Sequence, residues 1–419
     1  MPALSLADPT RKFAAVVTAR LTSVFGTFLS MIALNTYILD LTGSVAWMGL
    51  AMAVKVLSGM AATPFIGSAV DRGDRKRLMI VSDLILTVAM ASLALMPGAW
   101  AKYYIVLLMA LLGVFSNLFE VALSSAVPEI LGTQDTLKAN SWFMGGRNLV
   151  MAAAALCAVG ANFLFKGYAV IFLVDAATYL VSACVLYRLD IRTAGRRKAA
   201  GMAGEGLLAR LRAEFGELRG LENSRVVALF LFVLFLDTFA SGSHNVGFPV
   251  FSRMLRPDKP MLFYGLILFF WAGGNVAGIY GLNRWQALQR MRPETLYLSF
   301  TALMSVGMML IFQTRTPWFI FLAAVVAGMG DGTYQTYFTT YIQQVPDAVR
   351  GKVFALSSFA LRTGFGLGYI AVPLVLESLS VARTVLLFHG TALLILLLLV
   401  LTPGLLVPAK ARASEDAPV

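Results

Sequence analysis

Four ionisable side chains lie inside long apolar segments, where a charge is costly and commonly marks the path of a solute. They are Arg20, Glu120, Arg147 and Arg362. Counting about 1.5 Å per helical residue places all four at one level, roughly 10–14 Å from one end of their segments. One carboxylate cannot neutralise three guanidiniums, and arginine binds carboxylates and phosphates bidentately. The group is predicted to bind an anionic substrate. A structural ion cluster or arginines that snorkel outward would place the same residues there.

A second polar group lies near the middle of two later segments. Asp237 and His244 share one helical face with Ser241, and Asp331 shares another with two side chains predicted to contact substrate, Tyr334 and Gln335. A carboxyl group without water holds its proton more tightly, and histidine titrates near neutral pH. Asp237, Asp331 and His244 are therefore predicted to couple transport to protons. The alternative is that they hydrogen-bond between neighbouring helices.

The composition requires a membrane around these segments. The 419 residues are 58% hydrophobic and 13% charged, with a mean hydropathy of +0.77, whereas soluble domains carry about 25% charged residues. The polar opening MPALSLADPTRK lacks a hydrophobic region that ends in a small-residue cleavage site. We therefore expect no signal peptide, and the first apolar segment is expected to remain as a membrane span.

Apolar segments long enough to cross a bilayer recur along the whole chain. Twelve spans are predicted, at 13–39, 46–70, 78–97, 103–127, 140–165, 167–187, 225–250, 261–284, 295–314, 317–345, 353–377 and 381–403.

The lysines and arginines predict the orientation. With the N-terminus in the cytoplasm, cytoplasmic segments hold 23 of the 34 and outer loops hold seven. This asymmetry follows the positive-inside rule and places both termini in the cytoplasm. It also accounts for the net charge of +12 without a nucleic-acid partner.

One long polar segment divides the spans into two sets of six. We predict an N-terminal six-helix bundle over 1–187, a basic cytoplasmic linker over 188–224 and a C-terminal six-helix bundle over 225–419. Within the linker, leucines and a phenylalanine recur at helical spacing from Leu207 to Leu221. This pattern predicts an amphipathic helix on the inner membrane surface.

The two halves show weak signs of an internal repeat. The fourth span ends in VPEI (Val127–Ile130) and the tenth in VPDA (Val345–Ala348), and each proline is predicted to end its helix. An arginine enters the following span in both halves. Two parallel repeats of six helices form one large class of transporters.

Metal, cofactor and enzyme chemistry find no support in the sequence. Cys157 and Cys184 both lie in apolar runs, and no ligand spacing surrounds them, so neither a disulfide nor a metal site is expected. The two histidines are far apart in the chain, and no nucleophile–base pair lies at membrane depth. We expect no cofactor and no enzymatic activity.

The cytoplasmic stretch GSAVDRGDRKR (Gly67–Arg77) resembles the signature of the major facilitator superfamily, G-x-x-x-D-R-x-G-R-[RK]. Gly67, Asp71, Arg72, Arg75 and Lys76 match it, and Asp74 replaces a glycine. The resemblance implies an all-α fold of twelve transmembrane helices in two six-helix bundles. It also implies that this loop is a gating latch between the halves. Asp71 is expected to accept hydrogen bonds from a helix N-terminus, and Asp83 could join the latch.

Three further stretches are similar to bacterial exporters of siderophores and macrolides: LTGSVAWMGL, FLVDAATYLVSA and QQVPDAVRGKVFAL. The fifth span departs from the antiporter pattern G-P-x-x-G-G, since it reads VMAAAALCAVGAN. The resemblance implies a monomeric secondary transporter in the bacterial inner (cytoplasmic) membrane. We expect proton-coupled export of an anionic or zwitterionic metabolite, such as a carboxylate-type siderophore. The alternative is a multidrug or macrolide efflux antiporter.

Overall fold

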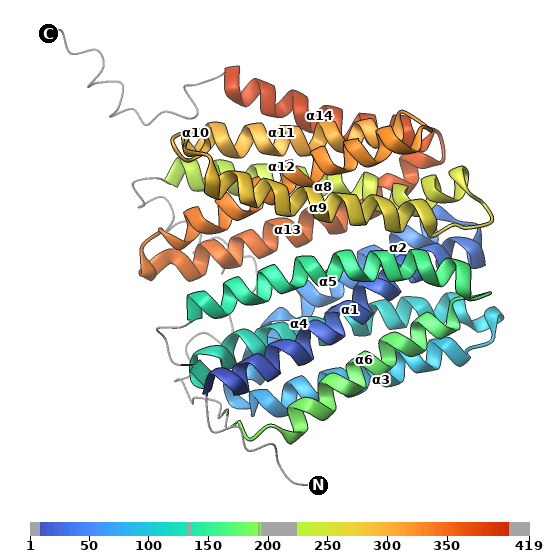
Figure 1. Ribbon diagram of the computed structural model, residues 1–419, viewed down its shortest axis with the longest axis vertical. Helices are drawn as coiled ribbons and strands as arrows, with labels where there is room; N and C mark the ends of the chain where they lie inside the picture. The colour runs from blue at the N-terminus through green and yellow to red at the C-terminus, as the bar shows by residue number, and fades with distance from the viewer. Residues whose placement is uncertain (1–8, 132–135, 192, 194–223, 402–419) are drawn as a thin grey trace, which may run out of the picture. The chain divides into compact units, whose positions relative to one another are not determined.

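A computed structural model describes residues 9–131, 136–191, 193 and 224–401. The described residues form thirteen α-helices (Figure 1). They are α1 (Pro9–Thr42), α2 (Val45–Arg72), α3 (Arg75–Leu95), α4 (Gly98–Leu131), α5 (Thr136–Leu164), α6 (Ala169–Arg188), α8 (Ser224–Leu255), α9 (Leu262–Arg284), α10 (Gln286–Gln289), α11 (Pro293–Phe312), α12 (Pro317–Gln343), α13 (Asp347–Leu376) and α14 (Val381–Leu401). The predicted linker helix over 207–221 lies outside the described residues.

Eleven of these helices are long and apolar enough to cross a membrane. The long helix outside that set is α12, which overlaps the predicted span over 317–345 and carries Asp331 and several glycines. The prediction of an all-helical, multi-pass membrane protein is confirmed.

The chain divides into two compact units, and the division crosses two helices. Unit 1 comprises residues 1–199 together with 248–272, and unit 2 comprises 200–247 together with 273–419. The end of α8 and the first part of α9 thus group with the N-terminal helices.

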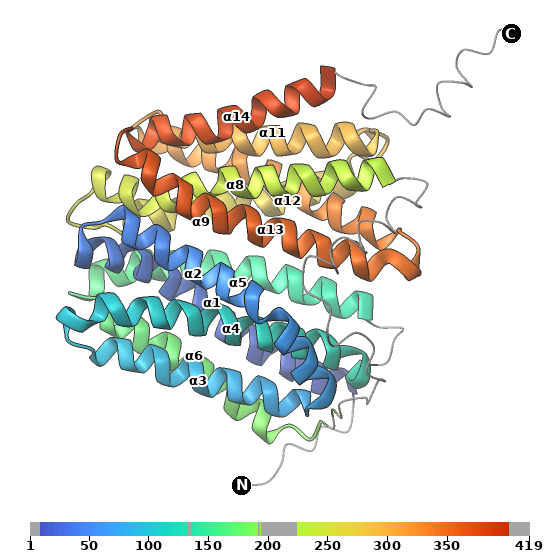
Figure 2. The ribbon, with the colours of Figure 1, turned by 180° about the vertical axis from the view of Figure 1, so that it is seen from behind.

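Unit 1 is built around α1, α3, α4 and α6. Helix α3 packs against α6 and α4, α1 packs against α6, α5 and α4, and α2 packs against α4. Figure 2 shows α3 and α6 side by side. Val16 of α1, Met79 of α3, Phe119 of α4 and Leu186 of α6 belong to one buried apolar cluster. This core fixes the depth of the polar side chains that the same helices carry.

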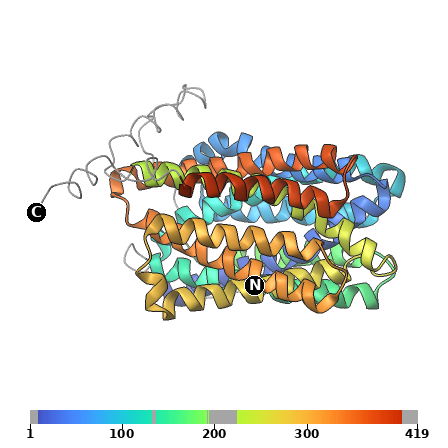
Figure 3. The ribbon, with the colours of Figure 1, turned by 90° about the horizontal axis from the view of Figure 1, so that it is seen from above.

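Unit 2 is built around α11, which packs against α12 and α14, and α13 also contacts both of these helices. Figure 3 shows α11 and α14 side by side from a third direction. Near the helix ends, Val227 and Leu231 of α8 form a buried cluster with Ile342, Val353 and Leu356.

Two glycines have clear structural reasons. Gly43 ends α1 with a positive φ of 62°, its N–H bonds Leu39 at 2.9 Å, and this conformation is easiest for glycine. Gly26 lies where α1 packs tightly against α6. A Cβ there would lie 2.1 Å from Thr178 Oγ1 and 2.5 Å from Asp175 Oδ1.

The prediction that Pro128 ends the fourth span is wrong. Helix α4 continues to Leu131, because a proline in the last turn removes one backbone hydrogen bond without preventing the residues after it from being helical. The matching prediction for Pro346 is confirmed, since α12 ends at Gln343 and Pro346 caps α13.

Candidate functional site

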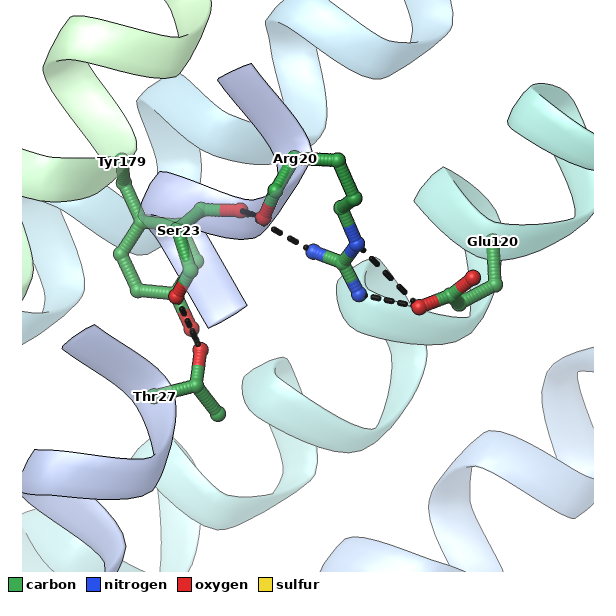
Figure 4. Close-up of polar contacts among 5 residues, drawn as sticks. All are labelled: Arg20, Ser23, Thr27, Glu120 and Tyr179. Atoms are coloured by element: carbon green, nitrogen blue, oxygen red, sulfur yellow. Dashed lines mark hydrogen bonds and ion pairs between the residues drawn. The ribbon is translucent and has the colours of Figure 1, made fainter. Parts of the chain in front are cut away.

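Arg20 of α1 and Glu120 of α4 form an ion pair in unit 1 (Figure 4). Arg20 Nη2 and Nε both donate to Glu120 Oε1, the latter at 3.2 Å. Arg20 Nη1 donates to Ser23 Oγ at 3.2 Å, and the guanidinium carbon lies 4.6 Å from the ring centroid of Phe119. The arginine is thus held on several sides, which suits its planar, five-donor group.

The two partners differ in accessibility. The side chain of Arg20 is 8% exposed, whereas that of Glu120 is 41% exposed. Arg20 lies eleven residues after the start of α1, and Glu120 lies eleven residues before the end of α4. Glu120 therefore presents an accessible carboxylate well inside a long helix, with the arginine buried behind it.

Arg147 of α5 lies near this pair. It is eleven residues after the start of α5, and its guanidinium carbon is 5.8 Å from the ring centroid of Phe28. It interacts electrostatically with Glu120 and Arg20. Its side chain is exposed, and it makes no hydrogen bond or ion pair with any described residue. Of the four residues that residue counting placed at one depth, Arg20, Glu120 and Arg147 interact with one another in unit 1, and Arg362 belongs to unit 2.

The other predicted substrate-contacting residues belong to unit 2. Arg362 is half-buried on α13, fifteen residues after its start. Tyr334 and Gln335 lie on α12, the first buried and the second exposed. Each of these two side chains already binds a carboxylate of its own unit.

The predicted proton-coupling carboxylates lie close together in unit 2. Tyr334 donates a 2.7 Å hydrogen bond to Asp237 Oδ2, and Gln335 donates one of 2.7 Å to Asp331 Oδ1. Asp237 and Asp331 are 3% and 5% exposed and interact electrostatically. The second Asp237 oxygen, Oδ1, is buried without a hydrogen-bond partner among the described residues. That atom can receive a proton without displacing an existing donor.

His244 contacts the second histidine of the chain. Its Nδ1 lies 3.0 Å from Nε2 of His389, and the two rings stack at 5.2 Å. His389 Nδ1 lies 3.1 Å from Ser305 Oγ. Both histidines are buried, so the pair forms a short polar chain across α8, α14 and α11.

The signature loop is organised by Asp74, the residue that departs from the family pattern. We expected Asp71 to accept from a helix N-terminus, but Asp74 caps α3 and accepts from the Lys76 N–H at 3.0 Å. It also accepts from Thr193 Oγ1 at 2.9 Å. Asp71 is exposed and makes no hydrogen bond with a described residue. Asp71 lies in the last turn of α2 and not at the position that caps α3.

Of the other residues that match the family signature, some contact neighbouring helices and others are exposed. Arg75 forms an ion pair with Glu129 at the end of α4, and the Lys76 amino group donates to Leu189 O at 2.7 Å, just after α6. Arg72 is exposed, and an added Cβ on Gly67 would meet nothing within 4 Å. Arg75 and Lys76 thus bind α3 to neighbouring elements of unit 1.

Sequence reasoning missed a polar cluster at the end of α1 in unit 1. Asp40 near the end of α1 pairs with Arg253 at 2.8 Å and accepts from the Tyr168 hydroxyl. Burial raises the pKa of the Tyr168 hydroxyl, as does its hydrogen bond to Asp40, so it stays a donor at neutral pH. Asp40 and Arg253 are 213 residues apart, and no local pattern could have paired them.

Comparison with known proteins identifies the fold family. The model of the Major Facilitator Superfamily matches residues 16–361. The candidate bacilysin exporters BacE of Bacillus amyloliquefaciens and Bacillus subtilis are each 24% identical over 79% of this chain and 81% of their own length. The match thus extends over most of both chains.

Solved structures show the same fold. The nucleoside transporter NupG, as its D323A mutant, superposes with a TM-score of 0.73 at 13% identity and covers 93% of this chain and 98% of its own. A D-xylose–proton symporter superposes with a TM-score of 0.70 at 14% identity. The superposition covers 92% of this chain and 96% of the symporter. With eleven candidate membrane-spanning helices and a family match over most of its length, this chain belongs to the major facilitator superfamily of secondary transporters.

Proposed function

We propose that the chain is a proton-coupled exporter of small zwitterionic or anionic metabolites in the bacterial cytoplasmic membrane. Transport proceeds by alternating access, in which two helical bundles rock about a central substrate. The relatives named as bacilysin exporters support the direction of transport. The matching residues of the signature loop act as its cytoplasmic latch.

The observation that carries the substrate class is the charge arrangement of Arg20, Glu120 and Arg147. Glu120 neutralises Arg20 and keeps an accessible edge, while Arg147 is exposed and makes no ion pair with the described residues. These three groups sum to one positive charge. A substrate carboxylate that binds Arg147 balances this net positive charge, and an ammonium group on the same substrate can bind Glu120. The site therefore favours a compact zwitterion. Arg362 of unit 2 is proposed separately as an anion-binding residue.

The proton-coupling residues proposed in unit 2 are Asp237, Asp331 and His244. Asp237 supports this role best, because its Oδ1 is buried without a donor. A buried carboxylate with one oxygen left without a donor is costly in its ionised form, so binding of a proton to Asp237 is favoured.

The test is titration calorimetry on the purified protein with bacilysin, a citrate-based siderophore, erythromycin and ethidium. We expect the carboxylate-bearing compounds to bind. Arg147→Ala is expected to weaken that binding by about 2 kcal/mol, the cost of truncating a charge pair. Arg147→Lys recovers only part of it, since an ammonium cannot bind a carboxylate as a planar fork does.

The matched control is Arg315→Ala, which removes an exposed arginine between α11 and α12 and leaves binding unchanged. Binding of erythromycin and ethidium alone would contradict the proposed substrate class and support multidrug efflux. Equal weakening by both alanine variants would also contradict it, because the effect would then be one of net charge.

A further inference from the structure

A carboxyl group outside the sites described above lies in the interior of unit 1. Asp83 of α3 is 0% exposed. Neither of its oxygens makes a hydrogen bond of normal geometry with a described residue, and the same is true of Ser182 Oγ. The Ser182 hydroxyl of α6 faces Asp83 as a weak donor. An ionised carboxylate that is buried with so little hydrogen bonding costs far more than a protonated one.

The charged and titratable groups around Asp83 come from three helices. Arg20 of α1 interacts with it electrostatically, as do Asp175 and Tyr179 of α6. From α4, the nearby charge is Glu120, which holds Arg20. Asp175 also interacts electrostatically with Lys55 of α2. Arg20 is the cation that interacts with Asp83, and it pairs with Glu120 as well.

Asp175 differs from Asp83 in being well bonded. Its Oδ2 accepts from the Ser30 hydroxyl, and its Oδ1 from Thr178 Oγ1 at 3.4 Å. The Tyr179 hydroxyl is in turn held by Thr27 Oγ1 at 2.7 Å (Figure 4). Since these neighbours have partners of their own, Asp83 remains the buried acid that lacks one in this part of unit 1.

The donors of Arg20 are occupied elsewhere. Its Nε and Nη2 both face Glu120, and its Nη1 faces Ser23. Because Glu120 is accessible, a ligand carrying an ammonium group can bind it directly and free the guanidinium. The freed guanidinium can then turn to Asp83, with which it already interacts electrostatically.

We propose that Asp83 is a proton-binding site controlled by Arg20. While Arg20 is paired with Glu120, Asp83 is protonated. When Glu120 is taken by a substrate cation, Arg20 pairs with Asp83, the O–H bond of Asp83 breaks and its proton leaves to water. Charge is conserved, since one substrate cation enters the group as one proton leaves. This exchange rests on the proposed transport function and supplies a second proton site, separate from the carboxylates of unit 2.

The experiment needs no substrate. Infrared difference spectroscopy during pH titration of the purified protein in nanodiscs resolves the C=O stretch of protonated carboxyl groups. We expect one such band in the parent to be absent in Asp83→Asn and unchanged in the control Asp190→Asn, an exposed aspartate after α6. In Glu120→Gln, Arg20 is freed without any ligand, so the midpoint of the band shifts to lower pH by one unit or more.

Three results would overturn the proposal: a band that survives in Asp83→Asn, a midpoint unmoved by Glu120→Gln, or an equal shift in the control. If Asp83→Asn does not purify as a folded protein, Ser182→Ala is the second probe, because removal of the facing hydroxyl changes the frequency of the Asp83 band. Calorimetry decides the substrate class separately, so failure of the proposed function leaves this spectroscopic result standing.

Discussion

Tyr334 on α12 donates a 2.7 Å hydrogen bond to Asp237 on α8. The contact joins two helices through buried polar groups, and the phenol is the donor to this carboxyl group among the described residues. The hydroxyl therefore decides how the carboxyl binds its proton.

Tyr334→Phe is expected to destabilise the protein and to impair proton-driven transport. Loss of a buried donor that faces a carboxyl group costs about 1–3 kcal/mol. The decrease appears in thermal unfolding of the purified protein. Tyr337→Phe, three residues further along the same helix and less buried, serves as the control. An unchanged melting temperature for Tyr334→Phe would show that the bond contributes nothing to stability.

Asp237→Asn and Asp331→Asn are expected to abolish proton-driven transport while substrate still binds. Asparagine keeps the shape of each side chain, but it cannot take up or release a proton in the physiological range. Calorimetry measures binding, and uptake into inverted vesicles measures transport. Retention of full gradient-driven uptake by both variants would exclude the two acids as proton carriers.

Substitutions of Asp71, in the last turn of α2, and of Asp74, which caps α3, provide a matched pair of variants. Asp74→Ala removes the cap of α3, a loss of about 1 kcal/mol, so its melting temperature falls. Asp71→Asn leaves stability near that of the parent, because Asp71 bonds no described residue, but it slows transport if the signature loop is a latch. Parental transport by Asp71→Asn would remove the latch role from that residue.

The helices were predictable because hydropathy over twenty residues is a strong signal. The nearness of Arg20, Glu120 and Arg147 was predictable because depth follows from residue counting, but the same count grouped Arg362 of unit 2 with them. The common depth of Arg20, Glu120 and Arg147 follows from the rise per residue and the orientation of their helices alone. The ion pairing among these residues was not predictable, since the sequence could not show that Glu120 pairs with Arg20 and not with Arg147.

Residues whose contacts depend on which face a helix turns toward its neighbours were missed or wrongly assigned. The depth of Asp83 was evident, but its interactions with Arg20 of α1 and Ser182 of α6 were not. His389 could not be matched with His244 across 145 residues, because only tertiary packing brings their helices together. Asp74 caps α3 because it directly precedes the helix, a position that favours aspartate. The comparison with the family signature had directed attention to Asp71 instead.

We propose that this chain exchanges a carboxylate-bearing metabolite for protons and that the metabolite binds at the group around Arg20 and Glu120. The most direct test uses inverted vesicles with an acid lumen and a lumenal pH-sensitive dye. Addition of bacilysin or a citrate-based siderophore outside is predicted to dissipate the gradient in vesicles containing the parent protein. Glu120→Gln and empty vesicles are predicted to hold it. The account is contradicted if neither compound dissipates the gradient, if ethidium alone does so, or if Glu120→Gln behaves as the parent does.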